Sequence, residues 1–144
     1  FFFYILILYF ILFNFSIFSC FQENKPHKNY QEMFTEFISK EKFNKDEVLL
    51  YPGLKDNSLK YSLTNEINRI AETFKLIQTS KKNAEKFYQI AIEIGIKSIS
   101  NYGLDTEDRT RVANYIEELM DIVELESSNG ILNNYVYGFD PTKK

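Results

Sequence analysis

The sequence has little of what most catalytic and metal sites require. It has one histidine, one cysteine, five glycines and no tryptophan among its 144 residues. A single cysteine excludes an internal disulfide, and one cysteine with one histidine does not make the usual zinc-binding spacings. His27 lies in a polar stretch, so a Ser/His/Asp or Cys/His catalytic arrangement is not expected, and no glycine-rich phosphate loop is present. We therefore expect a protein that is not an enzyme and that uses no metal or cofactor.

Charge is missing from residues 1–21 and is nearly balanced in the rest of the chain. The 17 Lys and Arg and the 20 Asp and Glu give a formal net charge of −3. Nucleic-acid binding needs a concentrated basic field that neutralises phosphates, so we expect no nucleic-acid partner. The length suits one domain behind an apolar leader.

The leader ends at the lone cysteine. Residues 1–13 are almost unbroken Phe, Ile, Leu and Tyr. A buried core helix is disfavoured because the run has no polar face, whereas a transmembrane anchor needs about 20 apolar residues and a signal peptide about 7–15. Ser19 directly before Cys20 favours a bacterial lipoprotein signal over an ordinary signal peptide or a retained anchor. We expect residues 1–19 to be removed and Cys20 to carry a covalent lipid. With no initiator Met or basic start, the sequence is expected to begin inside the leader.

A short tether is predicted to follow the cysteine. Residues 22–29 read QENKPHKN, which is polar, contains Pro26 and has no apolar period. Fully extended, these residues would span roughly 25–30 Å. Residues 20–29 are therefore interpreted as the lipidated cysteine and a flexible tether, and residues 30–144 as the folded domain.

Apolar residues recur at helical spacing through most of residues 30–123. The pattern predicts a helix over about 30–43, a second over about 59–77, a third over about 81–102, and a fourth that begins with the acidic cap at residues 105–108. The third helix is apolar over most of its circumference, so it is expected to be central in the bundle. Ala91, Gly95 and Ser98 form a strip of small residues where a neighbouring helix could approach closely, and Gly103 is the predicted C-cap.

Two further segments complete the predicted fold. Leu49, Leu50 and Leu54 are expected to cover one end of the core, near the turn signal of Pro52 and Gly53. The alternating aromatic residues of the C-terminal tail predict a short strand or an extended strap. The fold class is therefore all-α: a bundle of about four main helices, a short N-terminal tether and an extended aromatic C-terminal tail.

Three surface clusters are candidate partner sites. Lys81, Lys82 and Lys86 form a small basic patch that could meet an acidic protein or a sulfated glycan, but a solvated helix face is the simpler interpretation. An acidic cluster late in the fourth helix could hold a cation or bind a basic partner, but a solvated helix face is again the simpler interpretation: Glu117, Glu118, Asp121, Glu124 and Glu126. The tail aromatics could bind a partner or pack on their own domain: Tyr135, Tyr137 and Phe139.

Several features together resemble the small plasmid-encoded outer-surface lipoproteins of Borrelia spirochaetes. They are the Phe/Ile-rich leader, the relaxed lipobox formed by Ile17, Phe18, Ser19 and Cys20, the polar tether and the Lys/Asn/Ile-rich helical body. Phe18 departs from the small residue usual at its position. The resemblance implies a lipid-anchored protein of the outer membrane, at the cell surface, that binds host components.

Two functions remain open from the sequence. The first is a non-enzymatic, lipid-anchored surface protein that presents a helical interaction surface to host or vector molecules. The alternative is a periplasm-facing adaptor or structural lipoprotein that pairs with another bacterial envelope protein. A charged, solvated bundle would favour the first, whereas a large exposed apolar patch would favour the second. A deep pocket with converging carboxylates would favour an enzyme.

Overall fold

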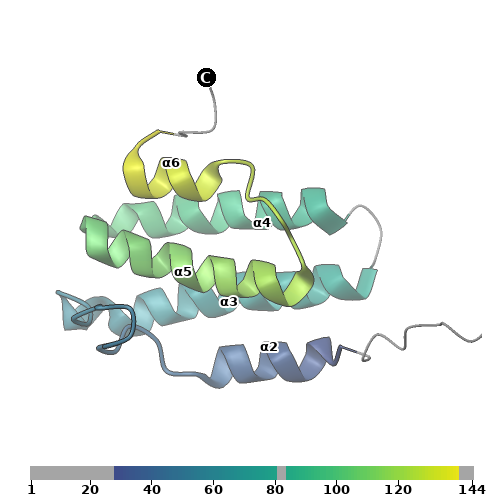
Figure 1. Ribbon diagram of the computed structural model, residues 1–144, viewed down its shortest axis with the longest axis horizontal. Coiled ribbons are helices and arrows are strands. Elements are labelled where there is room, and N and C mark those ends of the chain that lie inside the picture. The colour runs from purple at the N-terminus through teal and green to yellow at the C-terminus, as the bar shows by residue number, and fades with distance from the viewer. Residues whose placement is uncertain (1–27, 81–83, 140–144) are drawn as a thin grey trace, which may run out of the picture.

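The computed structural model describes residues 28–80 and 84–139, and this part of the chain is a bundle of α-helices without strands (Figure 1). The helices and the two 3-10 turns that extend them are α2 (Tyr30–Ser39), η1 (Asn57–Leu59), α3 (Lys60–Ser80), α4 (Ala84–Ile99), η2 (Ser100–Tyr102), α5 (Thr106–Val123) and α6 (Ile131–Tyr137). The predicted all-α bundle is confirmed. Cys20, Lys81 and Lys82 lie outside the described residues, as do the leader and most of the tether.

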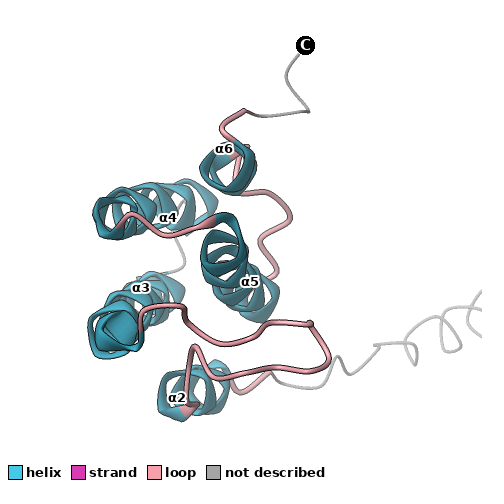
Figure 2. Cartoon of the chain, turned by 90° about the vertical axis from the view of Figure 1, so that its left-hand side faces the viewer, coloured by secondary structure: helices cyan, strands magenta, loops and turns pink. Residues whose placement is uncertain are grey.

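Helix α5 packs beside the pair formed by α3 and α4. Viewed end-on, α3 and α4 lie next to each other with α5 beside them, and α2 and α6 lie at opposite ends of the bundle (Figure 2). Asp105 caps the N-terminus of α5 as predicted, because its side chain accepts a hydrogen bond from the Asp108 N–H at 3.0 Å. The buried apolar face of α5 includes Val112, Ile116 and Leu119. The expectation that the third helix is central was wrong, since α4 exposes three apolar side chains to solvent: Phe87, Ile90 and Ile94.

Helices α3 and α4 approach each other closely at Gly95. A Cβ atom added to Gly95 would lie 2.5 Å from Cγ1 of Ile70 and closer still to its Cδ1. Ordinary van der Waals contact between carbon atoms needs roughly 3.5–4.0 Å. The predicted close approach at the strip of small residues is therefore confirmed at this position. Gly103 also ends its helix as predicted, with a left-handed φ of 64°.

The C-terminal tail is helical over Ile131–Tyr137, so the prediction of an extended strap was wrong. Leu132 and Val136 are buried, and Ile131 and Tyr135 pack partly buried against the core. These four positions follow the helical period, and packing them against α4 and α5 requires a helix. The strap was predicted from the alternating aromatic residues alone, and this left out the aliphatic residues among them, which complete the helical pattern.

The segment between α2 and α3 also differs from the prediction. Helix α2 ends at Ser39 instead of continuing to Phe43, which has a left-handed φ of 61°. Leu54 is buried as expected, but Leu49 and Leu50 are exposed and do not cover the core. Residues 46–51 of this segment instead form a tight turn in which Val48, Leu49 and Leu50 are exposed.

Candidate functional site

The turn over residues 46–51, here called the 46–51 turn, is closed at its base by main-chain hydrogen bonds. Asp46 and Tyr51 pair as an antiparallel bridge, with both N–H···O distances 2.8 Å. Within the turn, Oδ1 of Asp46 accepts the N–H groups of Val48 at 3.1 Å and Leu49 at 3.2 Å. The hydrogen bond from Leu49 is the largest cause that lowers the pKa of Asp46. The charge of Arg111 and the hydrogen bond from Val48 lower it further. Asp46 therefore fixes the turn as a carboxylate.

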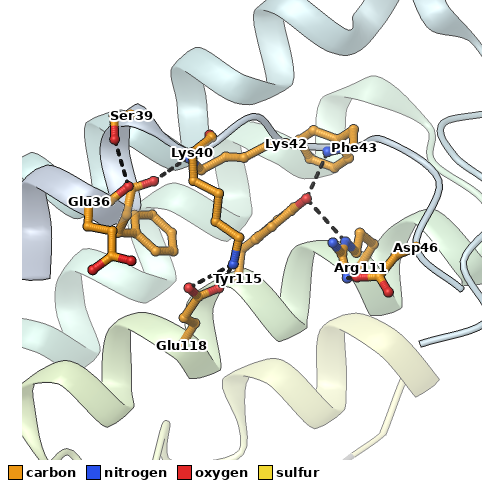
Figure 3. A network of polar contacts seen from close by, with 10 residues as sticks. Glu36, Ser39, Lys40, Lys42, Phe43, Asp46, Arg111, Tyr115 and Glu118 are labelled. Atoms are coloured by element: carbon orange, nitrogen blue, oxygen red, sulfur yellow. Dashed lines mark hydrogen bonds and ion pairs between the residues drawn. The ribbon is translucent and has the colours of Figure 1, made fainter. Parts of the chain in front are cut away.

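Arg111 of α5 holds the 46–51 turn against the bundle (Figure 3). Its Nη1 lies 3.1 Å from Oδ2 of Asp46, and its Nε donates a hydrogen bond to the Tyr115 hydroxyl at 3.1 Å. The guanidinium carbon lies 5.3 Å from the ring centre of Tyr51 and 4.7 Å from that of Tyr115. A cation over two aromatic faces gains from both ring quadrupoles. The ion pair with Asp46, the hydrogen bond to Tyr115 and the contacts with both aromatic rings therefore fix the position of the Arg111 side chain.

Two tyrosine hydroxyls complete the attachment. The Tyr51 hydroxyl donates to Oδ1 of the buried Asp108 at 2.7 Å. Burial, and then the hydrogen bond to Asp108, raise the pKa of Tyr51, so this phenol remains a donor. The Tyr115 hydroxyl accepts the N–H of Phe43 at 2.7 Å. The turn and the chain leading into it are thus bound to α5 at both ends.

The 46–51 turn presents three consecutive apolar side chains to solvent. Their exposed fractions are 91% for Val48, 53% for Leu49 and 88% for Leu50, and we call these residues the apolar tip. Leu50 has a φ of 52°, a left-handed conformation that is rare for a bulky residue and costs of order 1–3 kcal/mol. A cavity of about 180 Å³ lies between the tip and α5. A strained backbone therefore holds Leu50 in water, and the contacts to α5 fix the turn that carries it.

Lys42 is buried beside the C-terminal end of α2. It is 1% exposed, and its Nζ donates to the carbonyl oxygens of Phe37 at 2.7 Å and Lys40 at 3.0 Å. The ammonium also lies 4.5 Å from the ring centre of Phe37. Burial lowers the pKa of Lys42 to about 8, against the nearby charge of Glu118. Because solvent and ligands do not reach this nitrogen, its role is to close the C-terminus of α2.

The described residues include four of the six predicted partner residues, because Lys81 and Lys82 lie outside them. Lys86 is exposed on α4. Tyr135 is partly buried, whereas Tyr137 and Phe139 are mostly exposed, with ring centres 6.4 Å apart. In the acidic cluster, Glu118 forms an ion pair with Lys40 at 3.1 Å, as expected of a solvated helix face.

The apolar tip was missed because Leu49 and Leu50 were assigned to the core. The available signal was their position: three apolar residues stand between Asp46 and the Pro52-Gly53 pair, where a turn is expected.

Among the described residues, no cluster of three His, Cys, Asp or Glu side chains could hold a metal ion. None of the helices in residues 28–80 and 84–139 combines the length and apolar character needed to cross a membrane.

Comparisons with known proteins define a family. The sequence model of DUF4844, a domain of unknown function, matches residues 23–140, so the chain belongs to the DUF4844 family. The crystal structure of a DUF3571 family protein from Acinetobacter baumannii is similar, with 36% sequence identity and a TM-score of 0.66. The match covers 76% of this chain and 88% of that one. A search of curated proteins found no match.

Proposed function

We propose that this chain is a non-enzymatic, lipid-anchored surface protein whose helical domain binds another protein through the apolar tip. The observation that carries the proposal is the outward, strained and firmly attached conformation of Val48, Leu49 and Leu50. Exposed apolar groups that a fold holds rigidly are typical of recognition surfaces. The anchor on Cys20 rests on the lipobox-like sequence before it.

The tip has the energetic properties of a binding contact. Burying a valine or leucine side chain contributes about 1.5–3 kcal/mol, so the three residues offer of order 5 kcal/mol before the costs of association. Ordering a loop on binding is one of those costs. Asp46 and Arg111 already hold this turn in place, which reduces that cost. A partner with an apolar cleft that accepts a narrow protrusion fits this shape.

A tip variant tests the binding role. The change Leu49→Ser with Leu50→Asn keeps the turn, because Asn tolerates a left-handed φ, and removes most of the apolar surface. The matched control is Leu76→Ser on α3, which is also strongly exposed but stands on a helix. A photo-crosslinker at position 48 should give a discrete adduct in living cells that the tip variant loses and the control retains. An adduct that survives in the tip variant would refute the assignment.

Location decides between the two classes of partner. Cys20→Ala should abolish incorporation of labelled palmitate and release the chain from membranes; continued labelling would contradict the anchor. Protease added to intact cells should digest a surface-displayed chain, which favours a host or vector partner. Protection from protease would favour the periplasm-facing adaptor, an alternative that the apolar character of the tip also supports. Both outcomes leave the tip as the contact.

A further inference from the structure

Helix α4 has an apolar face that no other described helix covers. In the end-on view, α5 packs on one side of the α3–α4 pair, and the opposite side carries no further helix of the described residues (Figure 2). The exposed fractions on α4 are 48% for Phe87, 39% for Ile90 and 57% for Ile94. These residues stand at i, i+3 and i+7, so they form one continuous row along the helix, here called the α4 stripe. Single exposed apolar residues are ordinary, whereas a continuous row of them marks a contact surface.

Two residues of opposite charge flank the α4 stripe. Lys86 and Glu93 each stand one position before a residue of the stripe. Because seven residues make nearly two full helical turns, both charges lie on the same flank. Both residues are exposed, and neither forms an ion pair with a side chain in residues 28–80 or 84–139. The other flank carries the uncharged residues Ala91 and Ser98.

The stripe and the two charges have nearly the same centre. The midpoint between Phe87 and Ile94 falls just after Ile90, and the midpoint between Lys86 and Glu93 falls just before it. The two midpoints are one residue apart, which is about 1.5 Å along the helix. A two-fold axis near Ile90 that places a second α4 antiparallel on the first therefore packs stripe on stripe. It also brings each Lys86 opposite Glu93 of the second copy.

A second copy of the chain fits this face better than other occupants do. In a parallel pair each flank meets the opposite flank of the second helix, so Lys86 and Glu93 would face only Ala91 and Ser98. An unrelated acidic or basic partner would be matched by flanking charges of one sign. A base and an acid at equal distances from the centre are what a symmetric contact requires, because the same surface must complement itself.

We infer that a second copy of this chain docks on the α4 stripe, antiparallel and related by a two-fold axis near Ile90. The two Lys86–Glu93 ion pairs fix the orientation, as flanking charges do in coiled coils. Helix α4 has 16 residues and is about 24 Å long, so the interface is at the low end of the size of specific contacts. We expect a dissociation constant of about 1–100 µM. The 46–51 turn is attached to α5, so the apolar tip takes no part in this contact.

Single cysteines test the geometry of the contact in cells that express the full chain. Under mild oxidation Ile90→Cys should give a disulfide-linked dimer, because position 90 lies near the two-fold axis. Tyr61→Cys, at a strongly exposed position of α3, is the matched control and should give no more dimer than the parent chain, whose own cysteine is Cys20. Phe87→Cys and Ile94→Cys, in chains with different tags, should link to each other and not to themselves. Self-linking of Phe87→Cys would mean that the helices are parallel and would overturn the inference, as would a failure of Ile90→Cys to link.

Charge reversals test the ion pairs in the Ile90→Cys chain. Lys86→Glu and Glu93→Lys should each slow disulfide formation at least about 5-fold, because each turns two attractive contacts of the dimer into repulsive ones. The double reversal should restore the rate to within about 2-fold, since the pairs form again with exchanged signs. Lys97→Glu, a reversal on the same helix beyond these pairs, should change the rate less than about 2-fold. The tip variant Leu49→Ser with Leu50→Asn should also link at the parent rate. If the double reversal links as slowly as the single ones, or if the tip variant abolishes linking, the inference fails.

Discussion

Replacing Gly95 by alanine should destabilise the α3–α4 pair, although alanine is the better helix former. The new Cβ would lie 2.5 Å from Cγ1 of Ile70 and nearer still to its Cδ1. Ile70 is buried, so its side chain has little room to move away. One of the two helices must therefore shift, or Ile70 must take a strained rotamer.

The expected magnitude is the difference between two terms. Forcing an extra methyl group into a packed core costs about 1–3 kcal/mol, and an approach of 2.5 Å to Cγ1 of Ile70 belongs in the upper part of that range, about 2–3 kcal/mol. Alanine in place of glycine inside a helix contributes about 0.8–1.0 kcal/mol in the opposite direction. The net loss of unfolding free energy should be about 1–2 kcal/mol, which lowers the melting temperature of a domain of this size by several degrees.

A double-mutant cycle with Ile70→Ala isolates the steric term. With Ile70 truncated, the nearest remaining atom of that side chain is its Cβ, at 3.9 Å from the added methyl, which is ordinary contact. In that background Gly95→Ala should stabilise the protein by about 1 kcal/mol through helix propensity. Urea unfolding of the four proteins should therefore give a coupling energy of about 2–3 kcal/mol.

A control at Gly103 separates crowding from backbone conformation. Gly103 has no atom within 4 Å of an added Cβ, but its φ is 64°. Gly103→Ala should cost about 1–2 kcal/mol whether or not Ile70 is truncated. The reasoning at Gly95 is refuted if Gly95→Ala is as stable as the parent protein, or if its effect is the same in both Ile70 backgrounds.

Two more substitutions test the electrostatics and the capping. The pKa of Lys42 is about 8 in the folded protein and 10.5 ordinarily, so between these values the unfolded chain binds more protons and stability rises with pH. The unfolding free energy should increase by about 1.5 kcal/mol from pH 8 to about 9.5, and Lys42→Met should remove this slope; an equal slope in the variant would contradict the assignment. The range stops there because Tyr88 and Tyr135, with pKa values raised to about 12, make stability fall above about pH 10. Asp105→Ala should lower the unfolding free energy by about 1 kcal/mol, whereas Asp105→Asn, which keeps an acceptor, should lose less, as urea unfolding would show.

The helices were predictable because their determinants are local. The apolar period of residues 59–77, the Asp105 cap and the Gly103 C-cap each depend on neighbours a few positions away. The close approach at Gly95 also followed from a run of small residues on one face. The prediction that α4 is central in the bundle was wrong, because an apolar surface around most of a helix does not show which of its sides other helices cover.

The segment from Lys42 to Tyr51 could not be predicted, because distant partners determine its conformation. Phe43 bonds to Tyr115, and Asp46 pairs with Arg111, so both partners lie more than sixty positions away along the chain. No local pattern indicates such pairs. A cavity of about 610 Å³ lined by α4, α5 and α6 has the same origin, because its residues Lys97, Arg109 and Tyr135 come from three helices and meet through packing.

The Phe43 amide has an unusual hydrogen-bond acceptor, and its exchange with solvent therefore reports on the contact between its segment and α5. Its N–H donates to a side-chain hydroxyl of α5, 72 positions away, instead of to a carbonyl of its own segment. Amides inside a helix exchange with deuterium when that helix opens, whereas this amide exchanges when the segment separates from α5. The exchange rate of the Phe43 amide therefore measures how often the segment that carries the apolar tip separates from α5 while the helices remain folded.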